Sequence, residues 1–271
     1  MKLSFWTLGT PDWTNAQVVD AARRFGFDGV DLRCAAGRNV SVQSTPQEIE
    51  DLKRLFADNG IEISSILAYN ERGNAEDVDW TAVQDDVARH IELAQRLGTK
   101  AMRVNAASPA AGSDWDQYLQ GFALALTGAL SANDNVVLNM QNHPGAPNVE
   151  QIGRLVSMVH SPLFGAGFSP DHCVDMGDDV LASAETLAPV VKQLHLADRE
   201  RSGEGSGGKM RACLPGEGFV PNREVIETLK RHSYDGYISF KWEKPTYPDL
   251  PDAEVALPHF ISFMHDVLAK T

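Results

Sequence analysis

The stretch YISFKWE at residues 237–243 alternates strictly between polar and apolar side chains. Ile238, Phe240 and Trp242 form one apolar face, whereas the intervening residues carry hydroxyl, ammonium or carboxylate groups. A period of two is typical of a β-strand whose two faces meet different surroundings. Lys241 lies on the polar face near the end of the strand, where an inward lysine is costly unless it is paired or used.

Strand and helix patterns alternate along the chain on both sides of this stretch. We expect strands at residues 3–8, 28–33, 61–67, 100–105, 135–141, 163–169, 190–196 and 237–243. Each is followed by a helical pattern, near residues 14–25, 46–59, 79–97, 114–132, 148–159, 180–188, 222–232 and 254–269. The alternation lacks a Gly-x-Gly-x-x-Gly fingerprint, which favours a closed barrel over a dinucleotide-binding sheet. We predict an α/β fold, a single (β/α)8 TIM barrel over residues 1–271.

Composition narrows the class of partner. The formal net charge of −13 argues against a nucleic-acid partner, because neutralising phosphates requires clustered Lys and Arg. Three widely spaced cysteines form no disulfide framework and no zinc knuckle. No signal-peptide pattern and no membrane-spanning apolar run is present, so we expect a cytoplasmic protein with no membrane partner. A homo-oligomer stays open.

The Gly- and Ser-rich run Arg199–Gly218 follows the seventh strand. We predict a mobile loop over residues 199–218. It carries Arg and Lys residues near the place where barrels of this type often bind phosphate, so a lid over the site is one interpretation. An ordinary solvated loop is the other.

Strand alternation also predicts which side chains line the mouth of the barrel. Sites in such barrels lie at the C-terminal ends of the strands. The polar residues expected there are Asp31, Arg33, Arg103, Asn105, Gln141, His143, Ser169, His172, His195, Lys241 and Glu243. Barrel interiors are normally packed with branched apolar side chains, so this much polarity at one end predicts a site.

Several short motifs resemble one family over nearly the whole chain. They are LGTPDW at 8–13, FDGVDLR at 27–33, NHPG at 142–145, PDH at 170–172, LHLAD at 194–198, GEG at 216–218 and YDGYISF at 234–240. The chain resembles the sugar phosphate isomerase/epimerase family, whose fold is the xylose isomerase-like TIM barrel. The resemblance implies a small sugar-like substrate and one divalent metal, held by Glu on strand five, Asp on strand six, His on strand seven and Glu on strand eight.

The chain departs from the family at most of these ligand positions. Gln141 stands for the first Glu, Ser169 for the Asp and Lys241 for the last Glu, and only His195 is kept. Hard divalent ions require anionic oxygen ligands, and an ammonium group cannot coordinate while it is charged. We therefore expect no catalytic metal and no other cofactor.

Lys241 has three interpretations. As a fixed cation it would stabilise an enolate oxygen as negative charge develops. With a lowered pKa it would form a Schiff base. As a structural group it would pair with Glu243 or Asp31. His195 is the candidate general acid/base, because imidazole titrates near neutral pH, and its alternative is a neutral remnant of the metal site.

The other polar residues are assigned to the substrate. Gln141 would hold the reacting oxygen beside Lys241, and Ser169, His143 and His172 would orient hydroxyl groups. The remaining substrate-binding candidates are Arg103, Asn105, Glu243, Asp31 and Arg33. The two arginines would bind an anionic group of the substrate, or Arg103 would pair with Asp31 inside the barrel.

The sequence supports a metal-independent isomerase, epimerase or dehydratase/lyase. Its reaction would begin with proton abstraction next to a carbonyl in a small sugar-like or keto acid substrate. A second hypothesis is a pseudoenzyme that binds a sugar-like ligand without converting it. A third is a metal-dependent sugar isomerase or epimerase with an atypical ligand set. An endonuclease of the same fold is disfavoured, because its zinc ligands and basic surface are missing.

Overall fold

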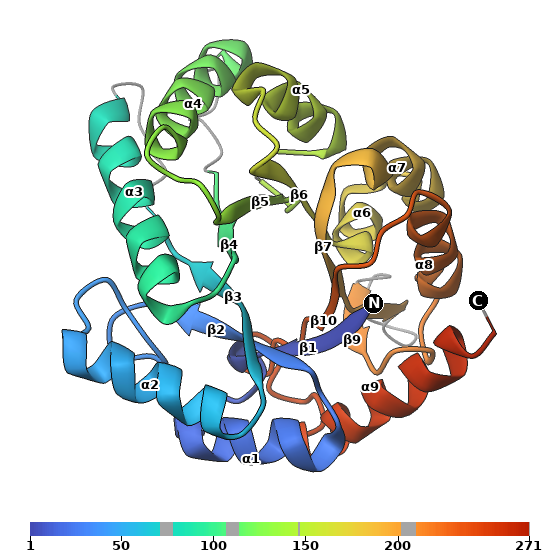
Figure 1. The fold of residues 1–271 in the computed structure, drawn as a ribbon. Coiled ribbons are helices and arrows are strands. Elements are labelled where there is room, and N and C mark those ends of the chain that lie inside the picture. Colours follow the sequence, from blue (N-terminus) through green and yellow to red (C-terminus); the bar gives the residue numbers. More distant parts are fainter. Residues whose placement is uncertain (71–77, 107–113, 146, 202–209, 271) are drawn as a thin grey trace.

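The computed structural model describes residues 1–70, 78–106, 114–145, 147–201 and 210–270. Parallel strands close a barrel in the spatial order β1-β10-β7-β6-β5-β4-β3-β2, and helices surround it (Figure 1). The strands are β1 (Lys2–Trp6), β2 (Gly29–Cys34), β3 (Glu62–Ala68), β4 (Ala101–Val104), β5 (Val137–Gln141), β6 (Phe164–Phe168), β7 (Val191–Leu196) and β10 (Tyr237–Phe240). The predicted (β/α)8 barrel is confirmed.

Helices follow the strands at the predicted places. They are α1 (Asn15–Phe25), α2 (Pro46–Asp58), α3 (Trp80–Leu97), α4 (Trp115–Leu130), α5 (Val149–Val159), α7 (Val180–Leu187), α8 (Asn222–Arg231) and α9 (Ala253–Leu268). Local chemistry sets their ends. Thr14 begins α1 with a reciprocal capping box to Gln17, and Gly26 ends that helix with φ 84°, a left-handed conformation that favours glycine.

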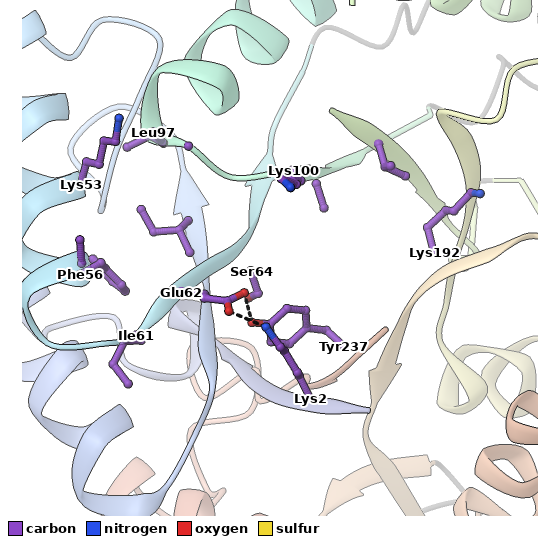
Figure 2. Close-up of a pocket in the computed structure, with 15 residues that line it drawn as sticks. Lys2, Lys53, Phe56, Ile61, Glu62, Ser64, Leu97, Lys100, Lys192 and Tyr237 are labelled. Atoms are coloured by element: carbon purple, nitrogen blue, oxygen red, sulfur yellow. Dashed lines mark hydrogen bonds and ion pairs between the residues drawn. The ribbon is translucent and has the colours of Figure 1, made fainter. Parts of the chain in front are cut away.

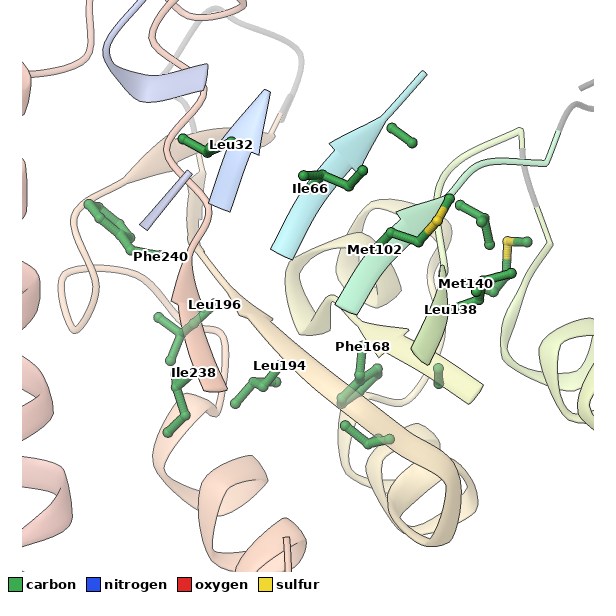
Figure 3. Close-up of a cluster of buried hydrophobic side chains, with 14 of the residues drawn as sticks. Leu32, Ile66, Met102, Leu138, Met140, Phe168, Leu194, Leu196, Ile238 and Phe240 are labelled. Carbon is green, nitrogen blue, oxygen red and sulfur yellow. The ribbon is translucent and has the colours of Figure 1, made fainter. Parts of the chain in front are cut away.

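The main core lies between the barrel and the helices. Apolar strand residues such as Leu138, Leu194 and Ile238 pack in one buried cluster with helix residues such as Val87 and Phe122 (Figure 3). Because successive strand residues point to opposite faces, the polar residues between them point into the barrel. The alternation therefore delivers polar groups to the barrel axis and mouth.

Three elements were not predicted. Helix α6 (Pro170–Met176) follows β6 directly at the mouth. Strands β8 (Asp198–Arg201) and β9 (Met210–Cys213) pair in antiparallel register after β7. They occupy part of the predicted loop 199–218, of which residues 202–209 lie outside the described residues. The expected mobility of this loop stays a prediction.

Among the described helices, none combines the length and the apolar character that a membrane crossing requires.

Candidate functional site

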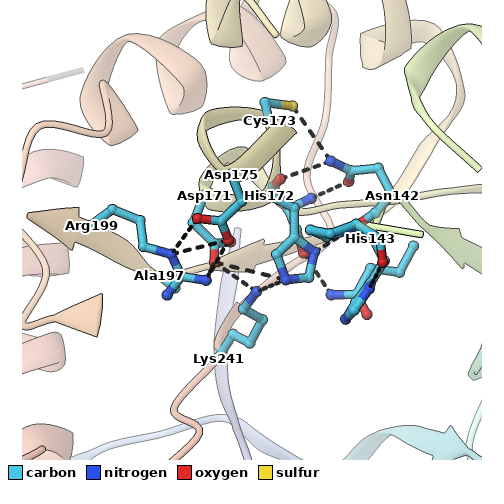
Figure 4. Close-up of polar contacts among 12 residues, drawn as sticks. Asn142, His143, Asp171, His172, Cys173, Asp175, Ala197, Arg199 and Lys241 are labelled. Carbon is cyan, nitrogen blue, oxygen red and sulfur yellow. Dashed lines mark hydrogen bonds and ion pairs between the residues drawn. The ribbon is translucent and has the colours of Figure 1, made fainter. Parts of the chain in front are cut away.

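Lys241 lies at the mouth of the barrel and is almost completely buried. Its backbone N–H donates to the carbonyl oxygen of Leu196 at 2.9 Å, which holds the residue beside the end of β7. Its ammonium nitrogen lies 2.7 Å from Asp171 Oδ2 and 2.6 Å from His172 Nε2 (Figure 4). Both partners belong to helix α6. Lys241 thus pairs with Asp171, and not with Glu243 or Asp31, the partners considered from the sequence.

A second cation holds the same carboxylate. Arg199 Nη2 lies 2.8 Å from Asp171 Oδ2 and 2.8 Å from Asp175 Oδ2, so the guanidinium bridges two acidic residues of α6 (Figure 4). Burial alone would raise the pKa of Asp171, but the charges of Lys241, His172 and Arg199 hold that pKa well below its usual range. Arg199 was expected in a solvated loop. It is buried instead, because β8 brings it back over α6.

His172 is held in one tautomer. Its Nδ1 lies 2.7 Å from the backbone oxygen of Asn142, so Nδ1 carries the proton and donates it to that carbonyl. Nε2 then accepts from the ammonium of Lys241 at 2.6 Å. Burial, followed by the charge of Lys241, lowers the pKa of His172 well below its usual value. The ring is therefore neutral near pH 7 and serves as a fixed acceptor for Lys241.

Gln141 and Ser169 complete the floor of the mouth. The amide nitrogen of Gln141 donates to the Ser169 hydroxyl at 2.7 Å, and the amide oxygen of Gln141 accepts from Arg103 at 3.1 Å. The Arg103 guanidinium also packs over the rings of Trp6 and Tyr69, at 5.2 Å and 5.3 Å from the ring centres. Three predicted site residues therefore form one connected hydrogen-bonded layer.

His143 is the exposed histidine of the mouth. Its Nδ1 lies 2.8 Å from the backbone oxygen of Pro144, so that nitrogen carries the proton and Nε2 keeps its lone pair. The ring packs edge-on against His172, with ring centres 4.4 Å apart. Partial desolvation lowers the pKa of His143, and the nearby charge of Lys241 lowers it further. A substrate above the floor can reach this neutral imidazole.

His195 lies beneath the floor and has no exposed surface. Its ring packs edge-on against Trp6 at 4.9 Å, and neither ring nitrogen has a hydrogen-bond partner in the described part of the chain. Burial, followed by the charges of Arg103 and Lys241, lowers the pKa of His195 well below its usual value. This geometry holds a neutral imidazole inside the barrel, below the groups that face the mouth.

Asp31 lies deeper still, inside the barrel. The hydroxyl of Ser4 donates to its carboxylate at 2.7 Å, and the hydroxyl of Ser239 and the amide of Gln193 donate to it as well. Complete burial raises the pKa of Asp31 to about 6, although these hydrogen bonds oppose the rise. The expectation that Asp31 lines the mouth is not matched by this position, and its charge stays within the barrel core.

The remaining predicted residues lie at the rim. Asn105 joins the ends of β3 and β4, since its amide donates to the backbone oxygen of Ala68 at 2.8 Å. Arg33 packs its guanidinium over the ring of Tyr69 at 5.3 Å. Glu243 is partly exposed beyond the end of β10, where its backbone oxygen accepts from the N–H groups of the following turn. None of these three lies within the Lys241–Asp171 pair.

The donor set of this site does not fit a divalent metal ion. Asp171, His172 and Asp175 present ligand atoms within 4.8 Å of one another. Lys241 and Arg199 already occupy them, however, and a divalent ion about 4 Å from either cation would be repelled by about 8 kcal/mol at an effective dielectric constant of about 20. Gln141 and Ser169 offer only neutral oxygens, which hard ions bind weakly without carboxylates. We derive no step through a metal.

Sequence reasoning missed Asp171, Asp175 and Arg199 as site residues. A signal for the first two was present, because Pro170 is a favoured first residue of a helix and Gly177 a favoured stop. Between them, the two acidic residues stand four apart and share one helix face. Arg199 had no comparable signal, since it stands in a Gly- and Ser-rich run.

A larger cavity of about 800 Å³ lies at the opposite end of the barrel (Figure 2). Lys2, Lys53, Lys100 and Lys192 stand around it, and Glu62 is held there by Lys2 and by the hydroxyl of Tyr237. The C-termini of the surrounding helices face this end, and their partial negative charge favours lysines. These lysines have a structural explanation, and the cavity contains none of the mouth residues.

Comparison with known proteins agrees with the observed architecture. The sequence model of the xylose isomerase-like TIM barrel family matches residues 19–263. No curated protein sequence matches the chain.

Solved structures of the same fold match almost end to end at low identity. The probable 3-DHS dehydratase AsbF from Bacillus anthracis is 19% identical, with TM-score 0.78 over 98% of this chain and 99% of that one. The IOLI protein with a bound zinc atom is 17% identical, with TM-score 0.80 over 100% and 99%. The 3-keto-D-glucoside 4-epimerase YcjR from E. coli is 13% identical, with TM-score 0.73 over 96% and 97%.

Proposed function

Because the chain belongs to the xylose isomerase-like TIM barrel family, we propose that it is an enzyme that works without a divalent metal. It isomerises, epimerises or dehydrates a small sugar-like or keto substrate, and the reaction begins with removal of a proton next to a carbonyl. The fold neighbours named above include a dehydratase and an epimerase, and both reaction types are compatible with this first step.

One observation carries the proposal. The buried ammonium of Lys241 lies 2.7 Å from Asp171 Oδ2, and Arg199 lies 2.8 Å from the same atom. Two organic cations thus neutralise the acidic group that a metal would otherwise use. A fixed positive charge near a developing enolate stabilises the transition state more than the ground state, and in a dry site it does so at no cost of reorganisation.

The proton is assigned to His143. Its ring is neutral and exposed to the mouth, and its free Nε2 lone pair is the group that a bound substrate meets first. Lys241 supplies positive charge from behind, through a floor that His172 and Gln141 hold in position. His195, the base expected from the sequence, lies below this floor. We assign it to the support of the floor, because it has no surface that a substrate could touch.

The second candidate function is binding of a sugar-like ligand without conversion. It is favoured by the saturation of the floor. The side chain of Lys241 is only 1% exposed, and Gln141 and Ser169 satisfy each other with a 2.7 Å hydrogen bond. A floor of this kind would bind hydroxyl groups at its edges and present little free chemistry.

The decisive experiment is proton exchange in D₂O. Purified protein, dialysed against EDTA and checked by elemental analysis, is mixed with a panel of ketoses, aldoses and keto acids. Nuclear magnetic resonance then follows loss of the signal of the C–H next to the carbonyl. We expect exchange that survives EDTA treatment, and a loss of about 10²–10⁴-fold in His143→Ala, the usual contribution of a general base.

His265→Ala is the matched control, because that histidine is exposed on α9, away from the mouth. Stoichiometric Mn, Zn or Mg together with an exchange rate that EDTA abolishes would replace the proposal by a metal-dependent isomerase or epimerase. Saturable binding without any exchange would establish the second candidate. A larger loss in His195→Ala than in His143→Ala would return the proton to His195.

A further inference from the structure

A small polar cavity lies beside the mouth, at the C-terminal ends of β1 and β2. Its volume is about 180 Å³. A water in the liquid takes about 30 Å³, so the space holds about six waters. Pockets for whole drug-sized ligands are larger, about 300–1,000 Å³. This cavity can therefore take one end group of a ligand and not a complete one.

The lining of this cavity is cationic. Its charged lining residues are Arg33 and Arg38, and no acidic side chain lines it. This is unusual in a chain whose formal net charge is −13. The lining also contains Thr14 and Asn15 at the start of α1, where the helix dipole adds partial positive charge. The local field favours an anion.

Arg33 is the residue that makes the cavity selective. In the part of the chain that the structure describes, no carboxylate lies within ion-pair distance of its guanidinium, and its buried Nε has no hydrogen-bond partner. Arg199, by comparison, satisfies its guanidinium with two carboxylates. A partly buried guanidinium without a counter-ion is costly unless a ligand supplies one, and its planar fork fits a carboxylate or a phosphate.

The cavity is also connected to the mouth. The guanidinium of Arg33 packs on the ring of Tyr69 at 5.3 Å, and that of Arg103 packs on the same ring at 5.3 Å. Arg103 in turn donates to Gln141 in the floor. A ligand that extends from the floor past Tyr69 therefore reaches Arg33 with its far end.

We infer that this cavity binds the anionic group of the substrate, a carboxylate or a phosphate, with Arg33 as its main contact. The inference rests on the proposed function for the word substrate, and it restricts the substrate class to sugar acids, keto acids or sugar phosphates, excluding neutral sugars.

Direct binding tests this inference separately from turnover. Calorimetry measures binding of D-gluconate, of D-glucitol 6-phosphate and of the neutral D-glucitol to the full chain. We expect one of the two anions to bind at least tenfold more tightly than D-glucitol, with an affinity that falls as salt rises. The better anion tells whether carboxylate or phosphate is the natural group.

Variants assign the binding to Arg33. Arg33→Gln should weaken the anion at least tenfold and leave D-glucitol unchanged, and Arg33→Lys should lose most of the same preference because it lacks the fork. Arg54→Gln is the control, since that arginine is exposed on α2 and pairs with Glu50 at 3.6 Å. Equal binding of the neutral and charged compounds, or unchanged anion binding in Arg33→Gln, would overturn the inference.

The two proposals fail in different ways. If Arg33-dependent anion binding is found and no compound of the panel exchanges a proton, the cavity is correct and the enzymatic proposal is wrong. If exchange is found with neutral sugars and Arg33→Gln leaves its rate unchanged, the enzymatic proposal stands and the cavity has no role in substrate choice.

Discussion

Replacing Lys241 by methionine should destabilise the protein strongly. Methionine keeps the length of the side chain and removes its charge. Asp171, which has no exposed surface, would then keep only Arg199, and His172 Nε2 would lose its donor. Breaking a buried pair by removing one partner typically costs about 3–5 kcal/mol, because an uncompensated charge is left behind. We expect a fall of that size in the free energy of unfolding at pH 8.

The pH dependence gives this prediction a sign. In the wild type the pKa of Asp171 lies below its unfolded value, so its ion pairs contribute stability above that value and lose it only as the solution becomes strongly acidic. Without Lys241 the effect of burial is less opposed, and the pKa of Asp171 rises. The penalty of Lys241→Met should therefore be smaller at pH 5 than at pH 8.

The assay is urea unfolding followed by tryptophan fluorescence and circular dichroism. Asp171→Asn in the Lys241→Met background should cost less than the sum of the two single changes, by about 1–3 kcal/mol, as expected for residues in contact. Lys244→Met is the control, because Lys244 pairs with the exposed Asp252 at 3.0 Å and such pairs contribute about 0–1 kcal/mol. A Lys241→Met variant as stable as this control would refute the reasoning.

Two further changes test the interior of the barrel. Asp31 has a pKa raised to about 6, so its ionisation should cost folding about 2–3 kcal/mol as pH rises from about 4 to above 6, at about 1.4 kcal/mol per unit. Asp31→Asn should remove this fall from the pH profile of the urea midpoint, and an unchanged profile would contradict it. Gly167→Ala would place a Cβ 2.6 Å from Asn139 Oδ1 and 2.8 Å from His195 Cε1, and overpacking of this kind should lower the melting temperature at a cost of about 1–3 kcal/mol. Gly153→Ala, whose Cβ meets nothing, is its control.

The barrel could be predicted from the sequence because its signals are local. The period of the strands, the caps such as Thr14 and the helix stops such as Gly26 act within a few residues of where they stand. Predicted and observed strands consequently differ by only a residue or two at most of their ends. The same alternation sent Gln141 and Lys241 to the interior, where the structure has them.

The pairing inside the mouth could not be predicted in this way. Alternation says which face a side chain takes, but it does not say which side chains meet across a closed ring of strands. The partner of Lys241 comes from α6, a helix of seven residues, which is too short to show a helical period. Its second cation, Arg199, comes from β8, whose pairing with β9 spans a Gly- and Ser-rich run. Both are tertiary facts that no short window of sequence contains.

The position of Arg199 on β8 links the barrel to an excursion outside it. Asp198, the preceding residue, accepts backbone N–H groups from Gly216 at 2.8 Å and Gly218 at 3.1 Å, so the return path of the excursion is tied to the same point. A descendant that trimmed this excursion would strand two acidic groups with a single lysine between them. Asp175 and Arg199 should accordingly be gained and lost together during divergence, while Lys241 and Asp171 can persist without them.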